Sequence, residues 1–187
     1  MSNLMVIAVS KNLGGLFMNL KILLALIFAL LLSTAVQAFP AQGDDVKFNL
    51  VETSVVLGKV YSGTYEEQIT ALDVTQDSFS LLNTLSIDGM LKAAHSTETG
   101  KASTLVTKAK IEDILQNCVS DGGKLETLQT GAGPIETCAE TVSNVHEIGT
   151  VWLGLVPFGT VQSDLFLRDS NISLQLYLQS YHNGGDR

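Results

Sequence analysis

Basic residues and catalytic motifs are scarce in this chain. Its 187 residues include 11 lysines and arginines against 19 aspartates and glutamates, and only three histidines. A polyphosphate partner requires a basic surface, so this composition argues against nucleic-acid binding. The sequence has no G-x-S-x-G, Walker or H-E-x-x-H motif, the patterns of nucleophile elbows, phosphate-binding loops and zinc hydrolases. We therefore expect no enzymatic activity, no cofactor and no metal ion.

Paired carboxylates do not change this expectation. Glu66 and Glu67 are adjacent in a stretch that is typical of a strand. Neighbouring side chains of a strand point to opposite faces, so such a pair cannot share one proton in acid–base catalysis. We interpret these carboxylates as solvated charges.

Acidic residues are absent from positions 1–38, where Lys11 and Lys21 are the only charged residues. The apolar run Ile22 to Leu32 has 11 residues, whereas a membrane-spanning helix needs roughly 20 and a signal-peptide core about 7–15. Small residues precede Phe39, which predicts a signal peptide over residues 1–38 with cleavage between Ala38 and Phe39. We therefore expect a periplasmic or secreted protein whose mature form does not span a membrane.

Two alternatives concern this segment. Met18 precedes an ordinary signal start, so it is a candidate initiator, with residues 1–17 as an extension. The competing hypothesis is an uncleaved anchor, which the apolar stretch Leu4 to Val9 favours. A lipoprotein signal would need a cysteine just after the cleavage point, and the first cysteine is Cys118.

The chain has only two cysteines, Cys118 and Cys138. An even, small number in an exported protein predicts one disulfide. A zinc site would require two further ligands, and His146 is the only histidine nearby. Two buried free thiols are the remaining alternative.

Residues 39–187 are expected to form a single β-rich domain. Alternation of apolar and polar residues is clearest in Ile172 to Tyr181 and indicates a strand. Further strands are expected near 44–50, 59–74, 79–87, 124–130, 135–142, 150–153 and 160–167. Residues 92–104 are small and polar, which favours a loop or a weakly paired edge, and residues 182–187 are expected to form a flexible tail.

One helix is predicted over residues 107–119. Ile111, Ile114, Leu115 and Cys118 recur at helical spacing, and Thr107 can cap the first turn. The fold class is therefore mainly β (α+β): a curved antiparallel sheet or half-open barrel of about seven or eight strands with one helix.

The C-terminal part resembles a known pattern. Residues 131–138 (GAGPIETC), then 151–153 (VWL) and 156–161 (VPFGTV) follow in order. This series resembles uncharacterised exported bacterial β-rich proteins with an AGTF-x-C strand, a Trp strand and a VPFG-x-V segment, some of them similar in shape to periplasmic lipoprotein carriers. The sequence departs from that pattern at 133–135 and at Gln162, where a lysine is common. The resemblance implies a topology and a compartment, but no catalytic residues.

Two function classes follow. Trp152 and Phe158 are interpreted first as core residues, and alternatively as the lining of a cavity mouth for an apolar ligand. The second interpretation gives a non-enzymatic binding or carrier protein whose partner is a lipid or another envelope component. The alternative is a structural or envelope-associated interaction protein without a ligand pocket.

Overall fold

A computed structural model of the chain describes residues 41–184. The predicted signal peptide, its cleavage site at Ala38–Phe39 and the alternative start at Met18 lie outside the described residues.

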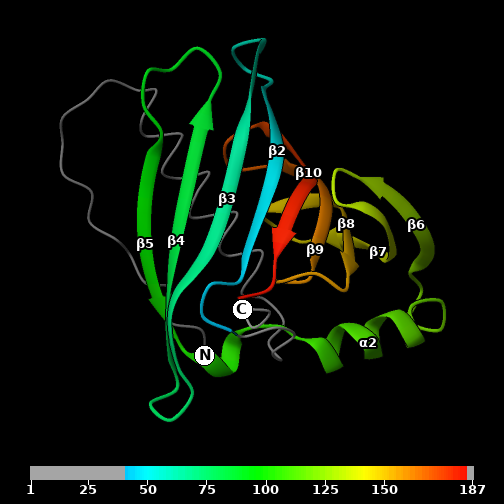
Figure 1. Cartoon of the computed structure of the whole chain (residues 1–187). Helices are drawn as coiled ribbons and strands as arrows, with labels where there is room; N and C mark the ends of the chain where they lie inside the picture. The colour runs from blue at the N-terminus through cyan, green and yellow to red at the C-terminus, as the bar shows by residue number, and fades with distance from the viewer. Residues whose placement is uncertain (1–40, 185–187) are drawn as a thin grey trace. The chain divides into compact units, whose positions relative to one another are not determined.

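The described residues form one antiparallel sheet of nine strands (Figure 1). The strands are β2 (Asp45–Ser54), β3 (Lys59–Asp73), β4 (Ser78–Ile87), β5 (Ala94–Gly100), β6 (Lys124–Thr130), β7 (Gly133–Ser143), β8 (Glu147–Gly154), β9 (Thr160–Leu167) and β10 (Ile172–His182). The predicted number of seven or eight strands was too low. The additional strand is β5, which pairs only with β4 at the edge of the sheet. Of the two alternatives for residues 92–104, a loop or a weakly paired edge, the structure has the edge.

The strand order is β5-β4-β3-β2-β10-β9-β8-β7-β6. Strands β2 to β5 form one meander, strands β6 to β10 form a second, and the pairing of β2 with β10 joins the two. The sheet is not closed into a barrel.

One face of the sheet is apolar, and we call it the inner face. Residues directly opposite each other on paired strands point to the same side, so the registers trace this face from strand to strand. Its buried apolar residues on β2, β3, β4 and β10 are Val46, Phe48, Leu50, Tyr65, Ile69, Phe79, Leu81, Leu85, Ile87, Ile172, Leu174, Leu176 and Leu178. The alternation predicted for the last strand is confirmed.

The predicted helix is present as α2 (Lys108–Asn117). The Thr107 side chain accepts a hydrogen bond from the Lys110 amide at 3.0 Å, which satisfies one of the free donors at the helix start. Ile111 is fully buried, and α2 packs against β7 and β8. A short 3-10 helix, η1 (Ala102–Thr104), precedes α2 and lies beside β4.

The β6–β10 meander curls back on itself. The Gly131 amide, in the turn between β6 and β7, donates a hydrogen bond to the Leu178 carbonyl oxygen of β10 at 3.1 Å. This contact falls where a bulge shifts the register of β10 between Leu178 and Ser180. A bulge bends the strand locally, and that bend brings β10 toward the turn.

The two ends of the described chain lie side by side. Strand β10 continues to His182, which is paired with Asp45, and the Gly184 amide donates to Asp44 Oδ1 at 2.7 Å. The predicted tail at 182–187 therefore begins within a strand, and its last three residues lie outside the described part.

Candidate functional site

The inner face of β2, β3, β4 and β10 is the candidate site. The α2 helix lies over a different part of the same face. The residue that follows it, Cys118, forms a disulfide with Cys138 of β7, which is opposite Leu153 of β8. A hydrophobic sheet face is normally covered by a second layer. Within residues 41–184, α2 provides that layer over β7 and β8.

Polar groups interrupt this apolar face, and those of three adjacent side chains form a cluster. Tyr65, Glu67 and Asn83 have no exposed surface, and Glu67 is opposite Asn83 in the pairing of β3 with β4. The Tyr65 hydroxyl lies 2.6 Å from Glu67 Oε1 and 3.2 Å from Asn83 Oδ1. The three side chains therefore form one hydrogen-bonded cluster surrounded by Phe48, Leu85 and their neighbours.

The environment changes the acidity of the cluster. Burial raises the pKa of Glu67 to about 7, against the opposing effect of the Tyr65 hydrogen bond, and repulsion from Glu98 adds to the rise. Burial, together with the nearby Glu67 charge, raises the pKa of Tyr65 well above its usual value. Burial also raises the pKa values of Glu52 and Glu98, which lie on the same face.

This cluster was not predicted from the sequence. The interpretation of Glu67 as a solvated charge was wrong, because Glu67 is fully buried, while Glu66 is partly exposed on the opposite face. The signal was present in the period-two series Tyr65, Glu67 and Ile69, in which a carboxylate occupies an inner-face position. The prediction that Glu66 and Glu67 point to opposite faces was correct, but the sequence pattern did not show which of the two points inward.

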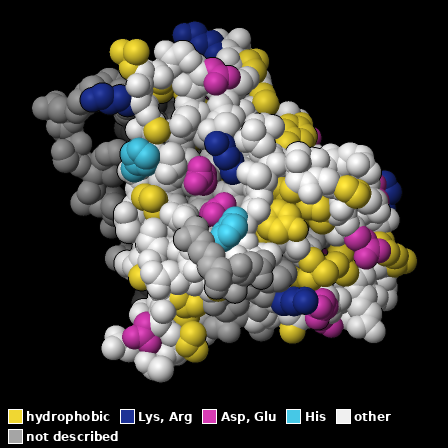
Figure 2. Space-filling view, viewed as in Figure 1, with side chains coloured by type: hydrophobic (Ala, Val, Ile, Leu, Met, Phe, Trp, Pro, Cys, Tyr) yellow, Lys and Arg dark blue, Asp and Glu magenta, His cyan; other side chains and the backbone are white. Residues whose placement is uncertain are grey.

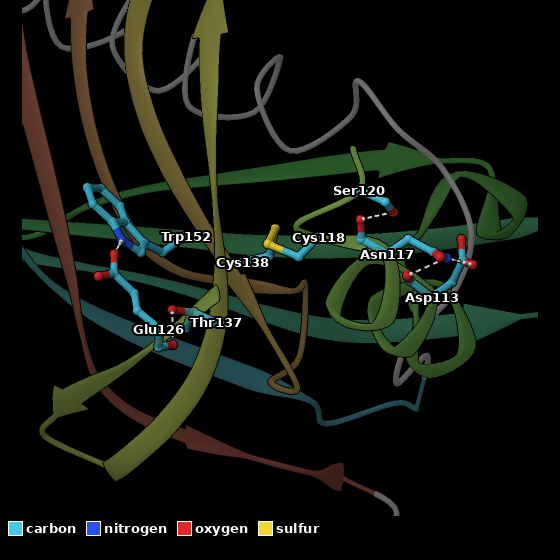
Figure 3. Close-up of a disulfide and its surroundings, with 8 residues drawn as sticks. All are labelled: Asp113, Asn117, Cys118, Ser120, Glu126, Thr137, Cys138 and Trp152. Atoms are coloured by element: carbon cyan, nitrogen blue, oxygen red, sulfur yellow. Dashed lines mark hydrogen bonds between the residues drawn. A yellow bond between two sulfur atoms is a disulfide. The ribbon is translucent and has the colours of Figure 1, made fainter. Parts of the chain in front are cut away.

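The structure places Trp152 away from this face. Val151 shares the inner face with Ser163 and Leu176, so the adjacent Trp152 points to the outer face. Its indole Nε1 donates to Glu126 Oε1 of β6 at 2.7 Å, across the strand that carries Cys138 (Figure 3). The Trp152 ring is half-buried.

Phe158 lies in the loop that joins β8 to β9. Its φ of 63° and the φ of 78° at Gly159 make a tight turn between the two strands. A Cβ atom at Gly159 would lie 2.7 Å from Ile111 Cδ1, so this backbone packs directly on α2. Trp152 and Phe158 are therefore not brought together with Glu67, and their role at a cavity mouth stays a prediction.

The predicted disulfide is present. The Cys118 and Cys138 sulfur atoms are bonded, and both residues are buried, so the bond connects the end of α2 to β7 (Figure 3). In residues 41–184 no group of three His, Cys, Asp or Glu side chains is arranged to hold a metal ion. Within the same range, the helices are too short or too polar to cross a bilayer.

Comparisons with known proteins give no family for this chain. No family matches the sequence, and no curated protein is similar to it. A solved protein with a YmcC-like fold from Bacteroides fragilis matches 79% of this chain and 99% of its own, with 10% identity and a TM-score of 0.45. The MucA/MucB complex of Pseudomonas aeruginosa matches 74% of this chain with 10% identity and a TM-score of 0.40, and this chain spans about half of that protein (51%). Likenesses this weak carry no argument about function.

Proposed function

We propose that the chain is exported and acts as a non-enzymatic binding protein for an apolar or amphipathic ligand. The observation that carries this proposal is the inner face of β2, β3, β4 and β10. Most of its buried side chains are apolar over four adjacent strands, whereas α2 packs on β7 and β8. An alkyl chain laid along these strands would gain about 0.8 kcal/mol for each buried methylene group.

The proposal predicts saturable binding of a fluorescent fatty acid by the protein produced with its own N-terminal segment. Leu176 is buried on the inner face, and Tyr177 is its neighbour on the outer face. The change Leu176→Trp fills space on the inner face and should weaken binding by about tenfold. The matched change Tyr177→Trp should leave the affinity unchanged.

Thermal melting of both variants shows whether the fold is retained. Failure of the unmodified protein to bind the probe, or equal losses in the two variants, would contradict the proposal. Native mass spectrometry of the protein purified from its export compartment would show any lipid that stays bound.

A second candidate function is an envelope-associated interaction protein. The turn between β2 and β3 exposes Val55, Val56 and Leu57 by 55% to 73%, and Leu91 in the turn between β4 and β5 is fully exposed. Both turns lie at the same end of the sheet, because Gly63 near the start of β3 is opposite Ile87 at the end of β4. Hydrophobic and basic side chains are visible at this end in Figure 2.

Exposed hydrophobic side chains grouped at one end are typical of a contact surface. For this function, cross-linking in envelope extract should capture a partner through the two turns, and the fatty acid should not bind.

A further inference from the structure

Three residues form a row across the strands β3, β4 and β5. Glu67 is opposite Asn83, and Asn83 is opposite Ser96. Neighbouring strands lie about 4.8 Å apart, so the row is short. Each member has a buried side-chain atom without a hydrogen-bond partner: Glu67 Oε2, Asn83 Nδ2 and Ser96 Oγ. Leaving such an atom unsatisfied costs about 1–3 kcal/mol, so three in one row require an explanation.

Two carboxyl groups, Glu67 and Glu98, give this part of the inner face a negative charge once they are ionised. Glu98 lies on the inner face beside the row, because it is opposite Leu81. In residues 41–184 no lysine, arginine or histidine forms an ion pair with Glu67 or Glu98. Because a buried carboxylate without a partner is costly to ionise, Glu67 keeps its proton up to a pH of about 7, and a bound cationic group would remove that cost and allow it to ionise.

The hydrogen-bonding capacity of the row matches one chemical group. The Tyr65 hydroxyl has a single hydrogen, so when it donates to an ionised Glu67 it must accept from Asn83. In the structure Asn83 Oδ1 faces the Tyr65 hydroxyl; this arrangement requires the opposite orientation of the amide, with Nδ2 toward Tyr65 and Oδ1 free. Glu67 Oε2, Asn83 Oδ1 and Ser96 Oγ are then three acceptors, and a primary ammonium has three donors.

We propose that the row of Glu67, Asn83 and Ser96 binds the primary ammonium head of an amphipathic ligand. This inference rests on the proposed function, since the alkyl chain of the ligand lies on the apolar inner face. A carboxylate head would be repelled by Glu67 and Glu98. A hydroxyl head supplies one donor and no charge, so it satisfies the row less well.

The test compares three ligands with the same tail, dodecylamine, dodecanol and dodecanoate, by calorimetric titration of the full chain below their micellar concentrations. Dodecylamine should bind at least about tenfold more tightly than dodecanol, because hydrogen bonds to charged groups are worth about 1.5–3 kcal/mol. Glu67→Gln should reduce this ratio to about twofold. Glu66→Gln removes the same charge from the outer face and should leave the ratio unchanged.

Equal affinities of the unmodified protein for dodecylamine and dodecanol would overturn the head-group site while leaving the apolar face as a binding surface. An unchanged ratio in the folded Glu67→Gln variant would overturn it as well. If none of the three ligands binds, both this inference and the proposed function are wrong. The comparison of the three ligands with the unmodified protein tests the head-group site even if Glu67→Gln fails to fold.

Discussion

Glu67 is the residue whose surroundings differ most from what its type leads one to expect. Its carboxyl group has no exposed surface and a single hydrogen-bond partner, Tyr65. With a pKa of about 7 in the folded chain, it holds its proton at pH values where an unfolded chain has released it. The stability of the fold should therefore depend on pH through this group.

The stability contributed by Glu67 decreases as the pH rises. Because the pKa is raised on folding, the stability that depends on the Glu67 proton is complete below the ordinary carboxyl pKa of 4.5 and is lost as the pH rises through about 7. The free energy of unfolding should fall by about 3 kcal/mol over this window. In Glu67→Gln the free energy of unfolding should fall by about 3 kcal/mol less over the same pH range. Urea denaturation at a series of pH values measures this difference.

Glu66→Gln should retain the full pH dependence of the unmodified protein. If the free energy of unfolding varied with pH in the same way in Glu67→Gln and in the unmodified protein, the Glu67 carboxyl would ionise at the same pH in the folded and the unfolded chain. That result would contradict the prediction.

At the scale of single elements, the link between α2 and β7 depends on the disulfide. The closed loop spans a sequence separation of 20 residues. Gly123 is the residue that makes room for the bond, since a Cβ atom there would lie 2.7 Å from Cys138 Sγ and 2.9 Å from Cys118 Sγ. The proximity of Gly123 to both sulfur atoms is visible only in the folded chain.

The double change Cys118→Ser with Cys138→Ser should lower the free energy of unfolding by about 3 kcal/mol, because the open loop has more freedom in the unfolded state. Chemical denaturation with and without a reducing agent measures this loss. Reductant should destabilise the unmodified protein by a similar amount and leave the double variant unaffected. If the reductant also destabilised the double variant, the loss of stability would not come from this disulfide.

Elements with strong local patterns could be predicted from sequence. Helix α2 has apolar residues at helical spacing, and β10 alternates at every position from Ile172 to Leu178, so both were placed nearly as observed. Strand β5 could not be placed in the same way, because Ala94–Gly100 contains no large apolar residue and its pairing depends on β4. The candidate site was missed for a related reason: Glu67, Asn83 and Ser96 are brought together only by strand registers.

At the scale of the whole described chain, the contact between Gly131 and β10 controls the curl of the second meander. A Cβ atom at Gly131 would lie 2.4 Å from the Gln179 carbonyl oxygen, which is a backbone atom and cannot swing aside. The change Gly131→Ala should therefore lower the free energy of unfolding by about 1–3 kcal/mol.

Hydrogen exchange should show faster exchange of the Gly131 amide and of the β6 amides in this variant. Ala132→Val, at the exposed neighbouring position, should change stability by less than about 0.5 kcal/mol. Unaltered exchange in Gly131→Ala would mean that the turn does not depend on its contact with β10.

The pairing of β2 with β10 also has a consequence for the order of folding. Every other neighbouring pair in the sheet is consecutive along the chain, whereas β2 and β10 are separated by all seven other strands. Local pairs close short loops and form early, but the β2–β10 pair must close a loop of more than a hundred residues, which is slow. We therefore expect each meander to form before β2 pairs with β10, so the continuous inner face should form in the slow step in which these two strands meet.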